Sequence, residues 1–116
     1  MQEIFTRALQ IAGKGAAGIF CSIDLDSVSQ AFAPGVSAPS PEGLSPEEIS
    51  LAALLAGRNE KIRYLDVMEL NPLFDHDSRT ARLAVALLHA FFCGLVQRQV
   101  KEARGGIGFK AEEARP

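Results

Sequence analysis

Apolar residues recur at helical spacing near the start of the chain. Ile4, Ala8 and Ile11 fall on one side of a helix with 3.6 residues per turn. Glycines in the segment 13–18 interrupt this pattern. The pattern therefore predicts a short helix over residues 3–12 that ends in a glycine-rich turn.

Two later segments have the composition of buried strands. In residues 18–26 the side chains alternate between two faces, and Asp24 and Asp26 stand at the end of the segment. The apolar face carries Ile19, Cys21, Ile23 and Leu25. A second strand is predicted over residues 62–69, and Pro72 follows it, because proline cannot continue a ladder of hydrogen bonds.

Between the two predicted strands lie a loop and a helix. Residues 27–44 are rich in Ser, Pro, Ala and Gly without a period, which predicts a long loop, and loops of this length are usually functional. Ser45 is a suitable helix N-cap, and Glu48 is placed to close a capping box with it. The helix is expected to end at Gly57.

A third helix is predicted after the second strand, with Asp77 or Ser78 as its N-cap. Its segment 83–96 is apolar on nearly every side, which predicts burial on most sides. At about 14 residues, this segment has the length of a core helix rather than of a membrane span. We expect residues 97–116, which contain a Gly105-Gly106 break and many charges, to form a frayed or disordered polar tail.

The predicted order of helix, strand, helix, strand and helix is typical of the α/β class with parallel strands. Two parallel strands alone make an unstable sheet, and a parallel sheet normally has neighbours at its edges. The sequence therefore predicts a slice of a larger domain.

The composition argues against some classes of binding partner for this protein. The net charge of the 116 residues is −2, with acidic and basic residues interspersed, so neither nucleic acid nor membrane is an expected partner. Cys21 and Cys93 are far apart and outside any CxxC pattern, which argues against a disulfide framework and against a zinc site. The first residues lack the pattern of a secretory signal. We expect a cytoplasmic protein.

Three carboxylates are the candidate functional groups. Asp24 and Asp26 stand two residues apart at the carboxyl end of the first strand, where ligands bind in parallel α/β sheets, and Glu69 closes the second strand. If the strands are parallel neighbours, all three acids meet at one rim, where a hard cation such as Mg²⁺ or Mn²⁺ would offset their repulsion. Acidic pairs at strand ends are also common as solvated turn residues or cap partners. Asp66, in mid-strand, is expected to be buried and hydrogen-bonded.

Several motifs in order resemble one enzyme family. They are Cys21-Ser22-Ile23-Asp24-Leu25-Asp26, Phe32-Ala33-Pro34-Gly35, Gly43-Leu44-Ser45-Pro46-Glu47-Glu48 and Leu65-Asp66-Val67-Met68-Glu69-Leu70-Asn71-Pro72. Together they resemble the ureohydrolases, the family of arginases, agmatinases and formimidoylglutamases. The resemblance implies that residues 1–96 form the C-terminal slice of a three-layer α/β/α parallel-sheet domain.

The resemblance also implies roles for the three acids. Asp24 would bridge two Mn²⁺ ions, Asp26 would bind one of them, and Glu69 would face the amidine or guanidine of a small substrate. The family's other ligands and its proton-shuttling histidine belong to upstream Gly-Gly-Asp-His and Asp-Ala-His-x-Asp segments, and neither motif occurs in this sequence. No catalytic set is therefore complete in this chain, and we expect the chain alone to be inactive.

Within the family, two features resemble the formimidoylglutamases. They are the segment Gly35-Val36-Ser37-Ala38-Pro39 and the ending Asn71-Pro72-Leu73-Phe74-Asp75 with Arg79-Thr80-Ala81-Arg82. The implied reaction converts N-formimidoyl-L-glutamate to glutamate and formamide in histidine degradation. Two alternatives stay open: a fragment of an agmatinase, arginase or guanidino-acid hydrolase, and a non-catalytic remnant that associates with itself. Because segment 83–96 is so apolar, we expect a homo-oligomer.

Overall fold

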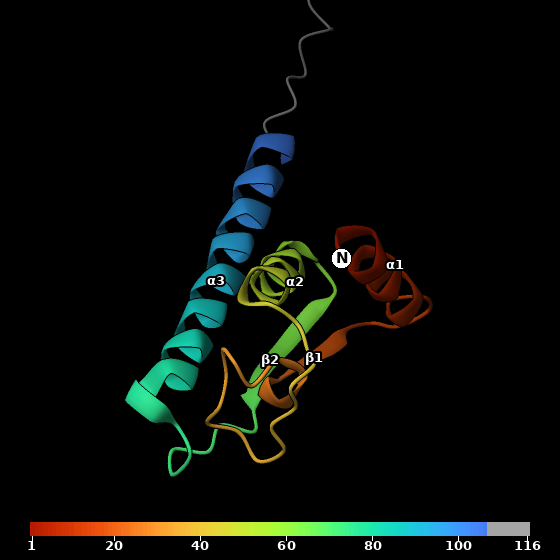
Figure 1. Cartoon of the computed structure of the whole chain (residues 1–116). Helices are drawn as coiled ribbons and strands as arrows, with labels where there is room; N and C mark the ends of the chain where they lie inside the picture. The colour runs from red at the N-terminus through yellow and green to blue at the C-terminus, as the bar shows by residue number, and fades with distance from the viewer. Residues whose placement is uncertain (107–116) are drawn as a thin grey trace, which may run out of the picture.

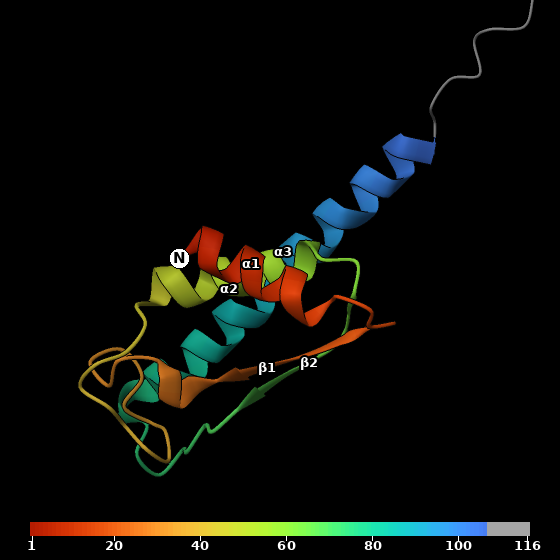
Figure 2. The ribbon, with the colours of Figure 1, turned by 90° about the vertical axis from the view of Figure 1, so that its right-hand side faces the viewer.

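The computed structural model describes residues 1–106, in which three helices lie on one side of a two-stranded parallel sheet (Figures 1 and 2). The predicted α/β class, the order of elements and the parallel pairing are confirmed. The elements are α1 (Gln2–Ala12), β1 (Ile19–Asp24), η1 (Leu25–Ser27), α2 (Pro46–Arg58), β2 (Ile62–Met68), η2 (His76–Ser78) and α3 (Arg79–Gly106), where η denotes a 3₁₀ helix.

The predicted start of α2 is confirmed in detail. The Glu48 amide donates to the Ser45 hydroxyl at 3.2 Å, and the Ser45 amide donates to the Glu48 carboxylate at 2.9 Å, so both halves of the capping box are present. Pro46 occupies the first helical position, where its missing N–H has no helical partner to lose.

The predicted end of α2 at Gly57 is wrong, because the helix continues to Arg58. Gly57 instead allows α2 and α3 to pack backbone to backbone. A Cβ atom on Gly57 would lie 2.1 Å from the Phe91 carbonyl oxygen, and one on Gly94 would lie 2.2 Å from the Leu54 carbonyl oxygen. The two glycines therefore serve the crossing of the helices and not a helix end.

The two strands are paired so that their inward side chains match. Cys21 lies opposite Leu65, and Ile23 lies opposite Val67. All four pack against the core beneath α2 and α3. Side chains alternate along a strand, so the intervening residues of both strands lie on the face away from the helices.

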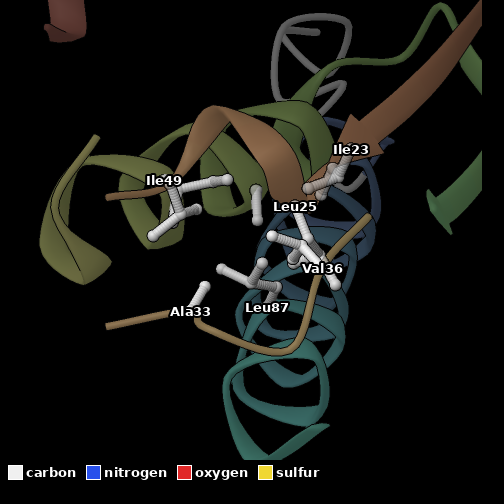
Figure 3. Packing of buried hydrophobic residues seen from close by; sticks show 8 residues of the cluster. Ile23, Leu25, Ala33, Val36, Ile49 and Leu87 are labelled. Atoms are coloured by element: carbon white, nitrogen blue, oxygen red, sulfur yellow. The ribbon is translucent and has the colours of Figure 1, made fainter. Parts of the chain in front are cut away.

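The hydrophobic core includes the long segment that was predicted as a loop (Figure 3). Val28 and Ala33 of this segment are completely buried, together with Leu25 of η1 and Leu87 of α3. The segment is irregular, as predicted, and it contributes buried residues to the core although most of its other residues are exposed or half-buried. These buried residues fix the position of the exposed Ser37, which directly follows Val36.

Helix α3 differs from its prediction at its end. It continues beyond Val96, where we expected a frayed tail, as far as Gly106. The extra turns are attached to the rest of the chain by two side chains. Arg98 donates from Nη1 to the Asn59 carbonyl oxygen at 2.7 Å, and Gln97 accepts a 2.6 Å hydrogen bond from Nε of Arg58. The remainder of the predicted tail, residues 107–116, lies outside the described residues.

One helix among residues 1–106, His76–Arg104, is long and apolar enough to cross a membrane when only length and composition are considered. Only 28% of its most apolar 18-residue window is buried among the described residues, so the predicted burial of segment 83–96 on most sides is not observed. A single helix of this kind is weak evidence, because core helices of soluble proteins pass the same test. This property alone therefore does not indicate a membrane span. The expectation that the chain has no membrane partner stays a prediction.

Candidate metal and substrate site

Asp24 and Asp26 lie at the carboxyl end of β1, but only Asp24 belongs to the strand. Asp26 lies in η1, so the prediction that both alternate along one strand is wrong. The cause is local, because Oδ1 of Asp24 accepts a 2.8 Å hydrogen bond from the Asp26 amide and caps the 3₁₀ turn. The Asp24 carboxylate nevertheless stays next to the backbone of Asp26 at the end of the strand.

Ser37 connects Asp26 with Glu69. The Ser37 hydroxyl donates to Oε2 of Glu69 and also lies 3.3 Å from Oδ2 of Asp26. Because a hydroxyl group has one hydrogen, it donates to one of the two carboxylates at a time. The amide of Ala38 donates to Oδ1 of Asp26 at 3.2 Å. The structure therefore brings two of the three predicted acids, Asp26 and Glu69, to the same hydroxyl group, while Asp24 is joined to Asp26 through the Asp26 amide.

Glu69 follows β2 directly and has an unusual backbone. Its φ angle is 71°, in the left-handed region that non-glycine residues seldom adopt and that often marks functional sites. The next residues attach this turn to the buried segment, since Leu70 forms a bridge with Val36 and the Asn71 amide donates to the Gly35 carbonyl at 2.8 Å. These contacts hold Glu69 beside Ser37.

The segment that carries Ser37 packs against the start of α3. The buried hydroxyl of Thr80 accepts a 2.8 Å hydrogen bond from the Gly35 amide. A Cβ atom on Gly35 would lie 2.3 Å from Cβ of Asp75, so only glycine fits. Gly35 is therefore the point at which the segment bearing Ser37 rests on the beginning of α3.

Asp75 is the residue that caps α3, and the prediction of Asp77 or Ser78 was wrong. Its two carboxylate oxygens accept hydrogen bonds from the amides of Thr80 at 2.9 Å and Ala81 at 3.0 Å. Desolvation acts to raise the pKa of Asp75, but these bonds outweigh it and lower the pKa below its ordinary value. Asp77 and Ser78 have positive φ angles, which a conventional N-cap does not have.

The carboxylate oxygens at this rim are of the type that a hard cation binds, but they are too few to hold one by themselves. Residues 1–106 contain no group of three or more His, Cys, Asp and Glu side chains that could hold a metal ion. Asp24 and Asp26 offer carboxylate oxygens, the donors that Mn²⁺ and Mg²⁺ accept, and hydrogen bonds orient both groups. The assignment of these two as ligands and of Glu69 to the substrate stays a prediction.

Sequence reasoning did not assign a role to Ser37. The sequence analysis uses the segment Gly35-Val36-Ser37-Ala38-Pro39 only as a feature that resembles the formimidoylglutamases. The signal that a functional residue lay there was the length of the segment 27–44, since long ordered segments in compact domains are often functional.

The environment of Asp66 differs from the one predicted from the sequence. Its atom Oδ1 is buried without a hydrogen-bond partner among the described residues, although we expected a bonded carboxylate. Burial raises the pKa of the nearby Cys21 thiol, and the negative charge of Asp66 raises it further. Cys21 and Cys93 are both free thiols.

This chain is similar in sequence to known proteins. The family model described as the arginase family matches residues 1–94. A formimidoylglutamase from Rhodococcus jostii is 45% identical over 71 residues, which is 61% of this chain and 22% of the relative. A formimidoylglutamase from Aromatoleum aromaticum is 37% identical over 95 residues, which is 82% of this chain and 28% of the relative.

Solved structures agree with the sequence comparison. A formiminoglutamase from Trypanosoma cruzi, crystallised with Mn²⁺, superposes with a TM-score of 0.77 at 33% identity, over 83% of this chain and 32% of that chain. The arginase from Bacillus caldovelox superposes with a TM-score of 0.73 at 30% identity, over 78% of this chain and 30% of that chain. This chain therefore has the fold of part of an arginase-like domain, and it spans less than a third of the relatives named here.

Proposed function

We propose, from the premise that this chain belongs to the arginase family, that it forms the C-terminal part of a manganese-dependent formimidoylglutamase. The reaction would be hydrolysis of N-formimidoyl-L-glutamate to glutamate and formamide in histidine degradation. The observation that carries the proposal is the contact of Ser37 with both Asp26 and Glu69, which brings a candidate metal ligand and a candidate substrate ligand to one rim.

Asp24 and Asp26 would hold the metal. Two Mn²⁺ ions at this rim would supply a nucleophile near neutral pH by lowering the pKa of bound water. Two aspartates fill only a minority of the ligand positions of two ions, and the described residues offer no larger cluster. The remaining ligands would come from the portion of the domain that the relatives have and this chain does not span.

Glu69 would bind the substrate. A carboxylate pairs with a planar amidinium through charge-assisted hydrogen bonds, which orients the carbon atom of the amidine toward the metals. The left-handed backbone of Glu69 and the hydrogen bond from Ser37 limit the directions in which this carboxylate can point. Orientation of the substrate would therefore be the contribution of this chain to the reaction.

A fusion protein tests the proposed function. The portion of the Rhodococcus jostii formimidoylglutamase that precedes its matched segment would be joined to this chain, and hydrolysis would be measured with N-formimidoyl-L-glutamate, agmatine, arginine and a guanidino acid. We expect the formimidoyl substrate to be preferred and formamide to be released. Preference for agmatine, arginine or the guanidino acid would replace the proposal by one of its alternatives within the family. No hydrolysis of any of them by a folded fusion with bound Mn²⁺ would refute it.

A non-catalytic remnant that associates with itself is the second candidate. Large apolar side chains at Val85, Phe92 and Val96 on α3 are each more than half exposed, an unusual property for a soluble monomer. A homo-oligomer in the cytoplasm is accordingly part of both candidates. Light scattering of the purified chain tests it, and a compact monomer at high concentration would contradict it.

A further inference from the structure

Asp66 has a buried carboxylate oxygen that the described part of the chain leaves without a hydrogen bond. Its atom Oδ1 has no donor among residues 1–106. Ser22 lies opposite Asp66 in the sheet, but its hydroxyl is not bonded to this atom. A buried acceptor without a donor costs free energy, and folded proteins rarely retain one. The complete environment of Asp66 therefore includes a donor from elsewhere.

The position of Asp66 relates it to the candidate metal site. Ser22 is paired with Asp66, and Asp24 stands two residues beyond Ser22 on β1. Side chains alternate along a strand, so Asp24 and Asp66 lie on the same face, the one that points away from the helices (Figure 2). Two residues span about 7 Å along a strand. Asp66 does not join Asp24 and Asp26 as a third ligand, since residues 1–106 contain no such group of three.

The chemistry of metal ligands indicates the donor. Two aspartates leave most ligand positions of two ions unfilled, and histidine is the commonest side chain that binds metals. A histidine that binds a metal through one ring nitrogen usually donates the N–H of the other nitrogen to a carboxylate or carbonyl oxygen. This bond fixes the orientation of the ring and makes the metal-binding nitrogen more basic. The free oxygen of Asp66 is an acceptor of the required kind.

Water on a metal ion is a less suitable donor to Asp66. Such water lies at the rim, where the substrate enters and where the Asp24 side chain is exposed. Oδ1 of Asp66 is buried below that rim, in the part of β2 that precedes Met68 and Glu69. A ring nitrogen extends from a metal ion into the protein, so it reaches this position where bound water does not.

We propose that Asp66 is a positioning residue of the metal site, whose Oδ1 atom accepts the ring N–H of a histidine that binds the metal. The histidine belongs to the portion of the domain that this chain does not span. The inference rests on the proposed function for the presence of the metal. It does not depend on which substrate is hydrolysed, because it concerns how the metal is held.

The Mn²⁺ affinity of the fusion protein tests this role. Titration followed by the electron paramagnetic resonance signal of free Mn²⁺ measures it. Asp66→Leu should weaken binding about ten- to a hundredfold, and Asp66→Asn, which keeps an acceptor oxygen, should weaken it less. Tyr64→Leu, on the same face of β2 and 70% exposed, is the matched control and should bind Mn²⁺ as the parent does. Unchanged affinity in Asp66→Leu, or equal loss in Tyr64→Leu, would overturn the proposal.

Unfolding in urea separates a positioning role from a purely structural one. Mn²⁺ that binds the folded state raises the unfolding midpoint, and this increase depends on the metal affinity. The increase should be smaller in Asp66→Leu than in the parent fusion at the same Mn²⁺ concentration. If Asp66 only supported the fold, its substitution would lower the midpoint equally with and without Mn²⁺. An equal increase in parent and variant would therefore overturn the proposal.

The signal of the ligand nitrogen identifies the donor. Pulsed electron paramagnetic resonance of the Mn²⁺-loaded fusion detects coupling to an imidazole nitrogen, which should change in Asp66→Leu and stay unchanged in Tyr64→Leu. Weaker Mn²⁺ binding with an unchanged nitrogen coupling would assign the bond to metal-bound water and overturn the proposal. A parent fusion that shows these effects of Asp66 but hydrolyses none of the four substrates would refute the proposed function and leave the role of Asp66 intact.

Discussion

Glu69 accepts a hydrogen bond from the hydroxyl of Ser37, 32 positions earlier in the chain. The same hydroxyl lies 3.3 Å from a carboxylate oxygen of Asp26, so the ends of β1 and β2 are related through a residue that belongs to neither strand. The φ angle of Glu69 is 71°, so this contact is made from a left-handed backbone conformation that is rare for residues other than glycine. Ser37 is accordingly the residue that positions the candidate substrate ligand.

Removal of the Ser37 hydroxyl should reduce catalysis by the fusion protein described above. Ser37→Ala is expected to lower kcat/KM about tenfold, which corresponds to about 1.4 kcal/mol, because Glu69 then has more freedom to turn away from the substrate. Ser37→Thr keeps the hydroxyl and should retain most of the activity. Because Ser37 is exposed, Ser37→Ala should leave the unfolding midpoint nearly unchanged. Equal activity of the Ala and Thr variants would contradict a positioning role.

Gly35→Ala should destabilise the chain. The added methyl group would lie 2.3 Å from Cβ of Asp75, so either the segment bearing Ser37 or the start of α3 must shift, at a cost of about 1–3 kcal/mol. Gly15→Ala is the comparison, because φ is +72° at Gly15 but no atom lies within 4 Å of an added Cβ. It should cost about 1 kcal/mol or less, from backbone strain alone. Urea unfolding measures both, and a Gly35→Ala variant as stable as the parent would refute the close packing.

Asp75 should make the stability of α3 depend on acid pH. The lowered pKa of Asp75 means that its carboxylate stabilises the folded chain above the ordinary pKa of 3.8, and that this stabilisation is lost as pH falls through the lower pKa of the folded state. Asp75→Asn keeps one acceptor oxygen but loses the second one and the negative charge, so it should cost roughly 0.5–1 kcal/mol near neutral pH, and this difference should shrink below pH 3.8.

Asp77→Asn is the matched control for Asp75→Asn. Asn tolerates the positive φ angle at this position, so little change in stability is expected. Urea unfolding at several pH values measures both variants against the parent chain. A difference between Asp75→Asn and the parent that grows toward acid pH would have the wrong sign and would contradict the capping role.

The regular elements could be predicted from local pattern, and the site only in part. The helical spacing of α1, the capping box at Ser45 and the alternation in β1 are local signals, and each predicted its element. The predicted ends of β1 and α2 were wrong because side-chain hydrogen bonds and helix packing, which are not visible in the local pattern, determine them. The carboxylate of Asp24 captures the Asp26 amide and ends β1 early, and Gly57 serves a helix crossing that no local pattern reveals.

The long-range contacts of the site could not be predicted from local sequence patterns. Asp24, Asp26 and Glu69 could be proposed because parallel strands end at one rim. Ser37 could not, because its role depends on how the buried segment containing Val28 and Ala33 folds onto the core. The cap of α3 was misplaced for a similar reason, since Asp75 reaches the amides of Thr80 and Ala81 across a turn whose positive φ angles the sequence does not specify.

The purified chain alone should release no measurable formamide or ammonia from N-formimidoyl-L-glutamate and should bind Mn²⁺ only weakly. Asp24 and Asp26 provide too few ligands for two ions, so the second ion is lost first. Calorimetric titration with Mn²⁺ and a product-release assay measure the two properties. Two tight equivalents of metal per chain, or clear turnover, would contradict the interpretation of this chain as part of a larger enzyme.

The central claim is that Asp24 holds metal whereas Glu69 holds substrate, and the Mn²⁺ content of two variants of the fusion protein tests it most directly. Elemental analysis of the purified Asp24→Ala fusion should show loss of paired Mn²⁺. The Glu69→Ala fusion should retain the Mn²⁺ content of the parent while it loses substrate binding and turnover. Equal loss of Mn²⁺ in both variants, or full Mn²⁺ content in Asp24→Ala, would contradict the account.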